Sequence, residues 1–239
     1  MSSTREPPAS GKAVFVREMF ATIAPRYDLT NRILTVRQDE RWRRRAIALL
    51  APRKHGEILD CCCGTGDLVF GLLRHDRTLT VTGIDFCEPM LERAAARARR
   101  EARGVARFVQ GDVMAMPFRE GTFDGATMGF SLRNVVDVVG TLREARRVLR
   151  PGARFVNLDV TKPANPLVRR LFGLYFYGIV PLVGGLVGGS KTAYRYLPNS
   201  LTNFPDAAGL AERFRTAGFA DVRTIRLGFG AIAIHVGTA

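Results

Sequence analysis

Cysteine and lysine are both scarce in this sequence. The few cysteines limit which disulfide or metal sites the protein can contain. The four cysteines are Cys61, Cys62, Cys63 and Cys87, a spacing that fits neither a disulfide framework nor a C-x-x-C metal site. We therefore expect a reduced, cytoplasmic compartment and no metal. The start of the chain lacks a basic segment followed by an apolar run and a cleavage site, so we expect no secretory signal.

Positive charge is abundant although lysine is rare. Lysine and arginine total 36 against 22 acidic residues, which gives a formal net charge of +14. Such a charge attracts anionic partners, namely nucleic acid, a membrane surface or an acidic ligand, but it does not choose among them. A solvated surface in which arginine replaces lysine accounts for the composition equally well.

Alternating strand and helix patterns predict an α/β fold for most of the chain, and 239 residues suffice for one compact domain. We expect a disordered start over residues 1–11, an N-terminal helical cap over 12–52, and a catalytic domain over 53–239. The sheet is expected to be mostly parallel, with a final antiparallel hairpin and helices on both faces. Strands are predicted at 57–61, 79–84, 107–110, 123–128, 154–159, 222–227 and 231–236, and helices at 14–24, 39–50, 89–101, 138–149 and 206–217.

An apolar insertion at about 163–203 interrupts this alternation. Residues 171–189 contain no charged residue and approach the roughly 20 residues that a membrane-spanning helix needs. Their glycines and Pro181 argue against a span, which would also separate the last helix and hairpin from the sheet they complete. We predict a helix followed by a flexible apolar loop that covers a lipophilic pocket.

A glycine turn follows the first predicted strand. Gly64 and Gly66 have no Cβ atoms and let a ligand approach the backbone. A dinucleotide site would need a third glycine where Val69 stands. Asp60, just before the turn, would repel a pyrophosphate but suits a ligand with a cationic ammonium and sulfonium.

Two more carboxylates stand at the ends of the next two strands. Asp85 can accept hydrogen bonds from ribose hydroxyls, and Asp112 can accept one from an adenine amino group. Phe86 and Met114 could enclose that ring. Any one of these acids could be an ordinary helix cap, but three at neighbouring strand ends predict a binding site.

These motifs occur in the order found in class I S-adenosylmethionine-dependent methyltransferases. The chain more narrowly resembles the menaquinone and ubiquinone C-methyltransferase family, with a Rossmann-like fold and a match from about residue 14 to the end. The specific motifs are Tyr27-Asp28-x-x-Asn31, Cys62-Cys63-Gly64-Thr65-Gly66-Asp67, Met116-Pro117-Phe118, Leu132-Arg133-Asn134-Val135 and Tyr194-x-Tyr196-Leu197-x-x-Ser200.

The resemblance implies S-adenosylmethionine as cofactor and a prenylated quinol as substrate. It favours demethylmenaquinol, with a polyprenyl methoxy-benzoquinol of ubiquinone biosynthesis as the alternative. It assigns cofactor contacts to Thr65, Asp85, Asp112 and Val113. Many relatives have serine where this chain has Gly129, which puts that cofactor contact in doubt.

Carbon methylation of a quinol requires a polar group near the ring hydroxyl, because loss of its proton makes the carbon nucleophilic. Arg133 and Asn134, directly after the fourth strand, are the candidate catalytic residues, together with Tyr27 in the N-terminal segment. The other candidate substrate contacts are Asn31, Phe130 and Tyr196. His235 is a conceivable base, but a lone histidine on an apolar strand is more often a core residue.

A quinol with a prenyl chain lies in the bilayer, so we expect peripheral attachment to the inner face of an anionic membrane. The Arg41–Arg45 stretch, with Trp42, and the apolar run at 171–189 suit this attachment. An exposed apolar stripe could also form a homodimer. Nucleic-acid methylation is the alternative that the charge suggests, although Gly129-Phe130-Ser131-Leu132 differs from the loop of base N-methylases. A non-catalytic subunit or scaffold is another alternative.

Overall fold

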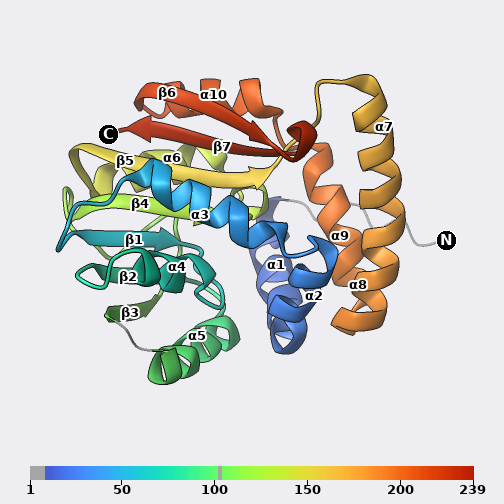
Figure 1. Cartoon of the computed structure of the whole chain (residues 1–239), viewed down its shortest axis with the longest axis horizontal. Helices are drawn as coiled ribbons and strands as arrows, with labels where there is room; N and C mark the ends of the chain where they lie inside the picture. The colour runs from blue at the N-terminus through green and yellow to red at the C-terminus, as the bar shows by residue number, and fades with distance from the viewer. Residues whose placement is uncertain (1–8, 102–103) are drawn as a thin grey trace.

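The computed structural model describes residues 9–101 and 104–239, and this part contains one seven-stranded sheet in the order β3-β2-β1-β4-β5-β7-β6 (Figure 1). β1 to β5 are parallel neighbours, whereas β7 runs antiparallel to both β5 and β6. The predicted α/β fold with a closing hairpin is confirmed. The strands are β1 (Glu57–Cys61), β2 (Thr80–Asp85), β3 (Val105–Gln110), β4 (Phe123–Gly129), β5 (Leu149–Val160), β6 (Ala220–Leu227) and β7 (Ile232–Thr238).

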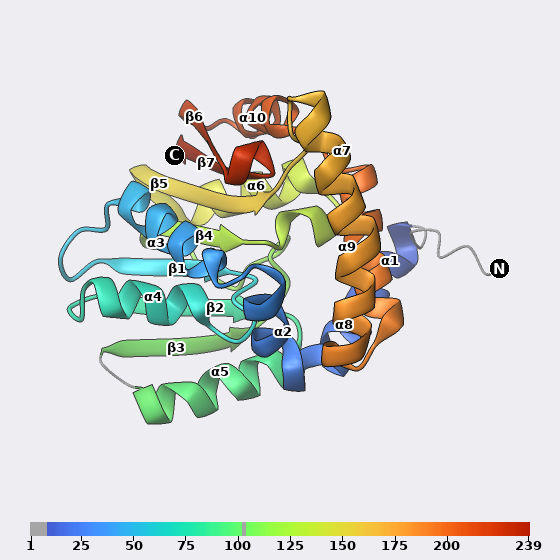
Figure 2. The same ribbon diagram turned by 45° about the vertical axis from the view of Figure 1, so that its right-hand side comes forward.

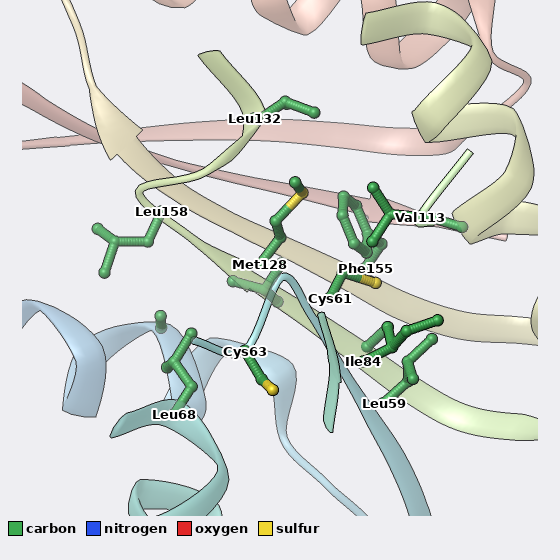
Figure 3. Packing of buried hydrophobic residues seen from close by; sticks show 14 of the residues in the cluster. Leu59, Cys61, Cys63, Leu68, Ile84, Val113, Met128, Leu132, Phe155 and Leu158 are labelled. Carbon is green, nitrogen blue, oxygen red and sulfur yellow. The ribbon is translucent and has the colours of Figure 1, made fainter. Parts of the chain in front are cut away.

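The central strands are buried on both faces, as parallel strands covered by helices must be. Leu59 of β1, Met128 of β4 and Phe155 of β5 are each 0% exposed, and Figure 3 shows this packing around Met128. The core continues beneath the glycine turn through Leu68. A rigid base of this kind holds the strand ends in place.

Helices cover both faces of the sheet. α3 (Gln38–Leu50) packs against α4 (Asp67–His75) on one face, and α6 (Val138–Val148) packs against α10 (Ala207–Thr216) on the other. α5 (Glu88–Glu101) packs on β2 and β3. Although α3 falls in the predicted N-terminal cap, it lies along β4 and β5 and is therefore part of the layered domain.

The remaining N-terminal elements lie beyond the strand ends, where Figure 1 shows α1 and α2 next to α8 and α9. They are α1 (Ala9–Ile23), the short helix η1 (Ala24–Arg26) and α2 (Tyr27–Leu34). α1 begins at Ala9, so the prediction of disorder is wrong for residues 9–11. The rest of that prediction, residues 1–8, lies outside the described residues.

The apolar insertion is helical almost throughout, and the predicted flexible loop is wrong. α7 (Pro166–Leu174), the π-helical turn η3 (Tyr175–Ile179) and α8 (Val180–Gly188) form one continuous helical stretch, followed by α9 (Lys191–Thr202) (Figure 2). A Cβ atom on Gly184 or Gly188 would lie 2.2 Å from the ring of Tyr194 on α9. These two glycines therefore serve close packing of two helices and not flexibility.

The start of β5 also differs from its predicted position. The helix expected to reach residue 149 ends at Val148, and Leu149 already pairs with Phe123 of β4. A bulge between Phe123 and Gly125 allows the pairing to continue past Pro151. A local sequence pattern does not reveal such an irregular pairing.

Candidate active site

The glycine turn connects β1 to α4 and uses its two glycines differently. Gly64 has a φ of +54°, and a Cβ atom there would meet nothing within 4 Å, so the backbone is open to a ligand. Gly66 has a φ of +86°, and a Cβ atom there would lie 2.7 Å from the ring of Phe70. Gly64 lines the cavity next to the turn, whereas Gly66 does not.

The three carboxylates predicted from the strand ends line this same cavity. The side chain of Asp60 is 1% exposed, and its Oδ1 accepts a hydrogen bond of 2.8 Å from Thr127 Oγ1. Burial raises the pKa of Asp60 to about 7, against the lowering effect of that hydrogen bond. A cation that bound beside Asp60 would restore its ionised form.

Asp85 connects two backbone segments of the cavity wall. Its carboxylate accepts hydrogen bonds from the backbone N–H of Gly64, at 2.8 Å, and of Cys87, at 2.9 Å. Burial raises the pKa of Asp85, and these backbone donors oppose the rise. Asp112 is exposed and accepts a hydrogen bond of 2.8 Å from the backbone N–H of Met114.

Most of the predicted site residues surround one cavity. The sides formed by Phe86 and Met114 are apolar, as an adenine ring would need. The predicted residues that line the cavity are Tyr27, Asp60, Gly64, Thr65, Asp85, Phe86, Asp112, Val113, Gly129 and Asn134.

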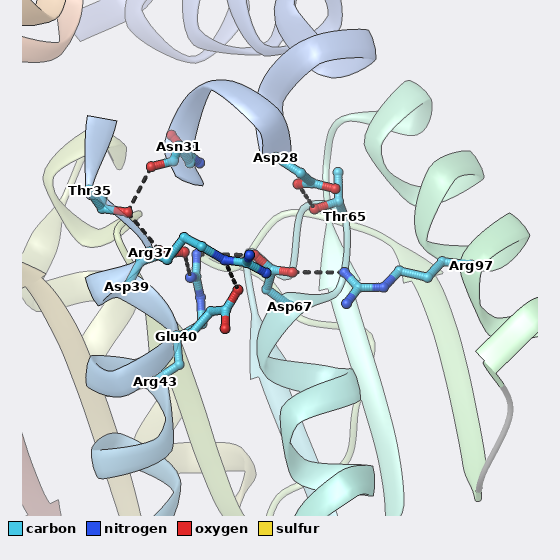
Figure 4. A network of polar contacts seen from close by, with 10 residues as sticks. All are labelled: Asp28, Asn31, Thr35, Arg37, Asp39, Glu40, Arg43, Thr65, Asp67 and Arg97. Carbon is cyan, nitrogen blue, oxygen red and sulfur yellow. Dashed lines mark hydrogen bonds and ion pairs between the residues drawn. The ribbon is translucent and has the colours of Figure 1, made fainter. Parts of the chain in front are cut away.

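The N-terminal helices close the cavity from the side opposite the sheet. Ala13, Val16 and Phe20 of α1 contribute apolar surface. Asp28 of α2 accepts a hydrogen bond of 2.6 Å from Thr65 Oγ1, which links α2 to the glycine turn (Figure 4). The cap and the turn therefore form one wall.

Tyr27 lies at the start of α2, facing the cavity. Burial raises the pKa of its phenol, and a hydrogen bond with Asn31 and the nearby charges of Arg43 and Arg133 oppose this rise. The phenol is therefore a neutral hydrogen-bond donor at neutral pH. Asn31 does not line the cavity itself and acts on it through Tyr27.

Arg133 and Asn134 lie on the short helix η2 (Leu132–Asn134) and face different surroundings. Both are 7% exposed. The Arg133 guanidinium forms an ion pair with Asp159 and donates a hydrogen bond of 2.7 Å to the Phe130 carbonyl, and it does not line the cavity. Asn134 does, and neither its Oδ1 nor its Nδ2 has a protein partner among the described residues.

Two other predicted contacts lie outside the cavity wall. Phe130 stacks under the Arg43 guanidinium, 5.4 Å from its central carbon. Tyr196 is 3% exposed and packs edge-on against Phe15, with ring centroids 5.2 Å apart. His235 is buried, and its Nε2 lies 2.8 Å from the Ala207 carbonyl, which agrees with a core role.

Gly129 lines the cavity, and packing against Leu68 explains why this position has no side chain. A Cβ atom there would lie 2.8 Å from Leu68 Cδ1, so serine at this position would require Leu68 to move. Ser131, two residues later, lines the cavity with a hydroxyl that donates to the Gly129 carbonyl at 3.0 Å. Sequence reasoning did not identify Ser131.

Arg43 and Asp67 are charged residues of the cavity that sequence reasoning also missed. Arg43 had been grouped with the surface arginines, but its side chain is only 11% exposed and pairs with Asp39 and, at 3.2 Å, with Asp67. The signal was present, because Arg43 stands four residues before Ile47 and seven before Leu50. That spacing places it on the buried face of α3.

The sequence matches known methyltransferases over almost its whole length. The sequence model of the ubiE/COQ5 methyltransferase family matches residues 9–239. A demethylmenaquinone methyltransferase of Roseiflexus sp. (strain RS-1) is 43% identical over 237 residues, covering 99% of this chain and 98% of that protein. A demethylmenaquinone methyltransferase of Thermus thermophilus is 44% identical over 220 residues, covering 92% of this chain and 99% of that protein.

Solved structures support the fold at lower identity. A SAM-dependent methyltransferase from Thermotoga maritima, described as a possible histamine N-methyltransferase, superposes with a TM-score of 0.65 and 21% identity. It matches 92% of this chain and 98% of its own. The agreement concerns the fold alone.

Proposed function

Because this chain belongs to the ubiE/COQ5 methyltransferase family, we propose that it methylates a ring carbon of demethylmenaquinol in respiratory quinone biosynthesis. The full-length similarity to two demethylmenaquinone methyltransferases supports this substrate. The single observation that carries the proposal is one cavity lined by Asp60, Asp85, the open Gly64 backbone and the Asn134 amide, which has no partner among the described residues.

The residues of the cavity fit S-adenosylmethionine. The open space at Gly64 admits a ligand against the backbone, and Asp60 supplies buried negative charge for a cationic amino acid moiety. Asp85 keeps free lone pairs for ribose hydroxyls after accepting two backbone hydrogen bonds. When bound, the cofactor supplies a methyl group already activated as a sulfonium.

The protein then has to orient the quinol and exclude water. The Asn134 amide and the Tyr27 phenol can hold the ring hydroxyl by hydrogen bonds. Arg133 acts as a positioning residue, since its contacts with Asp159 and the Phe130 carbonyl fix η2 and thereby Asn134.

Methyl transfer to quinols separates the candidate substrates. Purified protein is incubated with labelled S-adenosylmethionine and detergent-solubilised demethylmenaquinol, or with the demethylated benzoquinol of ubiquinone synthesis. We expect label on the naphthoquinol ring, and we expect Asn134→Leu to bind the cofactor without turnover. Transfer to the benzoquinol alone would assign the other substrate, and cofactor binding without any quinol methylation would refute the proposal.

We also propose that the protein is cytoplasmic and attaches peripherally to the inner face of the membrane through α7 and α8. Residues Pro166–Gly188 are long and apolar enough to cross a bilayer, and only 22% of the most apolar 18 residues of this stretch is buried. One side of this stretch packs on α2 and α9, with Arg26 donating to the Val187 carbonyl at 3.4 Å. Because one side of the stretch packs against the rest of the protein, a helix that lies on the membrane is favoured over a helix that spans it.

The exposed side of this helix supports membrane contact. Apolar side chains that are 58–72% exposed follow one another along it, and Arg169 and Arg170 stand beside them. Trp42 is excluded from this surface, because it is half-buried against Phe130. The apolar residues are Leu167, Leu171, Leu174, Leu182 and Leu186.

Sedimentation with vesicles tests this attachment. We expect binding to vesicles containing anionic phospholipid at low salt, weaker binding at high salt, and loss of binding in Leu182→Glu/Leu186→Glu. The variant should keep its affinity for S-adenosylmethionine. Wild-type protein that stays in the supernatant at low salt would refute the attachment, and a doubled mass without vesicles would indicate that a second copy covers this side.

A further inference from the structure

Arg43 is turned away from the other arginines of its segment. Arg41, Arg44 and Arg45 are exposed, whereas the Arg43 side chain is 11% exposed and reaches the cavity. The helical period explains this difference, because positions 39, 43, 47 and 50 share the buried face of α3.

Within the described residues, Arg43 is the only lysine or arginine that lines the cavity, which otherwise holds four carboxylates. The cation predicted to serve the quinol, Arg133, pairs with Asp159 outside the cavity wall. The position available for a cation at the substrate is therefore on α3 and not after β4.

Neighbouring side chains fix the Arg43 guanidinium in this position. Nη1 contacts Asp39, and Nη2 lies 3.2 Å from Asp67 (Figure 4). The guanidinium also lies over the ring of Phe130. Asp67 in turn pairs with Arg97 at 2.7 Å. Since a guanidinium has five N–H donors, these contacts leave others free for a ligand.

The charge of Arg43 already acts on its cavity neighbours. It lowers the pKa values of Tyr27 and Asp60 against the effect of burial. Tyr27, a neutral donor beside it, can hold the same ligand oxygen.

We propose that Arg43 is a catalytic residue that contacts the hydroxyl oxygen of the quinol and stabilises its deprotonated form. The inference rests on the proposed function. The hydroxyl gives its proton to water, and the ring carbon then forms the new C–C bond as the S–CH₃ bond breaks. That carbon finally loses its hydrogen as a proton, which restores the aromatic ring.

A coloured phenol measures the charge effect without turnover. A nitro-substituted naphthol is bound in the presence of demethylated cofactor, and its pKa is read from the absorbance of its phenolate. We expect the wild type to lower the pKa of the bound probe and Arg43→Gln to raise it by about 1 to 3 units relative to the wild type. An unshifted pKa in the wild type, or the same pKa in Arg43→Gln, would overturn the proposal.

Turnover provides the second measurement. Arg43→Gln should lower kcat about 100- to 1,000-fold and move the acidic limb of the kcat profile to higher pH, while Arg43→Lys recovers part of both. Cofactor affinity, measured above pH 8 where Asp60 is ionised, should change by less than about threefold. Arg93→Gln, an exposed change on α5, is the control and should match the wild type.

Folding and the identity of the cation are controlled separately. Because Arg43→Gln leaves Asp39 without its ion-pair partner, the variant Asp39→Asn/Arg43→Gln removes both charges and should show the same loss of activity. A profile that shifts in Arg133→Gln but not in Arg43→Gln would assign the cation to Arg133. Wild-type protein that binds cofactor but methylates no quinol would instead refute the proposed function, whatever the probe shows.

Discussion

The two halves of the cavity are assembled in different ways. The cofactor half consists of Asp60, Asp85 and Asp112, each at or near the end of its own strand and next to the glycine turn. The acceptor half combines Tyr27 of α2, Arg43 of α3 and Asn134 of η2, which are distant in the sequence. The first half follows from local order along the sheet, whereas the second depends on how α2 and α3 pack.

The largest effect should come from Asp85→Asn in the cofactor half. Asparagine has only one acceptor oxygen, so it cannot accept from both the Gly64 and Cys87 backbones as Asp85 does. Loss of one of these charge-assisted hydrogen bonds, worth about 1.5–3 kcal/mol, and of the charge that strengthens the other should weaken S-adenosylmethionine binding about 100-fold or more by calorimetry. The exposed Asp112→Asn is the matched variant and should lose roughly tenfold. Equal losses of affinity in the two variants would contradict the expectation that the buried Asp85 contributes more than the exposed Asp112.

The pH dependence of cofactor binding should come next in size. Since the pKa of Asp60 is raised to about 7, the free protein carries a neutral carboxyl below that pH and must lose a proton when the cation binds. We expect affinity to fall roughly tenfold per pH unit below 7 and to be flat above pH 8. The fall should vanish in Asp60→Asn, and a fall of equal slope in that variant would exclude Asp60 as the titrating group.

The same shift predicts an opposite effect on the stability of the free protein. A carboxyl whose folded pKa lies above its unfolded value of 3.8 costs stability as the pH rises from about 4 to 7. Asp60→Asn should therefore unfold at higher urea concentration than the wild type at pH 8. Its free energy of unfolding should be greater by at most about 4 kcal/mol. The gain should disappear near pH 4.

The two glycines of the turn provide a smaller and more local test. Gly64→Ala introduces a Cβ atom into open space and should weaken cofactor binding about tenfold with a stability loss of about 1 kcal/mol from the positive φ. Gly66→Ala places its Cβ against Phe70 and should lower stability by about 2–3 kcal/mol. Calorimetry and urea unfolding separate the two. Equal losses of affinity would show that both glycines face the cofactor.

Particular residues show how far sequence reasoning extends. The mostly parallel sheet was predictable from the alternation of strands and helices. The carboxylate positions were predictable because parallel strands end at one edge of a sheet, and Asp85 needed only its own strand to be placed. Arg133 followed the same reasoning but turned toward Asp159, a partner 26 residues away on β5. Arg43 carried a helical signal that was masked by the exposed arginines around it.

The long apolar helix shows the same limit on the outside of the molecule. Its glycines suggested a loop, because glycine usually marks flexible backbone. Whether a glycine loosens a chain or lets another helix approach depends on what lies opposite it. Only the fold reveals that Tyr194 fills the space beside Gly184 and Gly188.

The smallest expected effect separates these two roles of glycine. In Gly184→Ala the new Cβ would meet the Tyr194 ring, and the strain should exceed the gain in helix propensity, for a net loss of about 1–2 kcal/mol. Gly173→Ala has nothing within 4 Å and should gain about 0.5–1 kcal/mol. Thermal unfolding in detergent-free buffer should thus move Tm down by a few degrees in the first variant and up slightly in the second. If this segment were a loop, the two variants would not shift Tm in opposite directions. Neither new methyl group would then contact a neighbouring helix or add helix propensity.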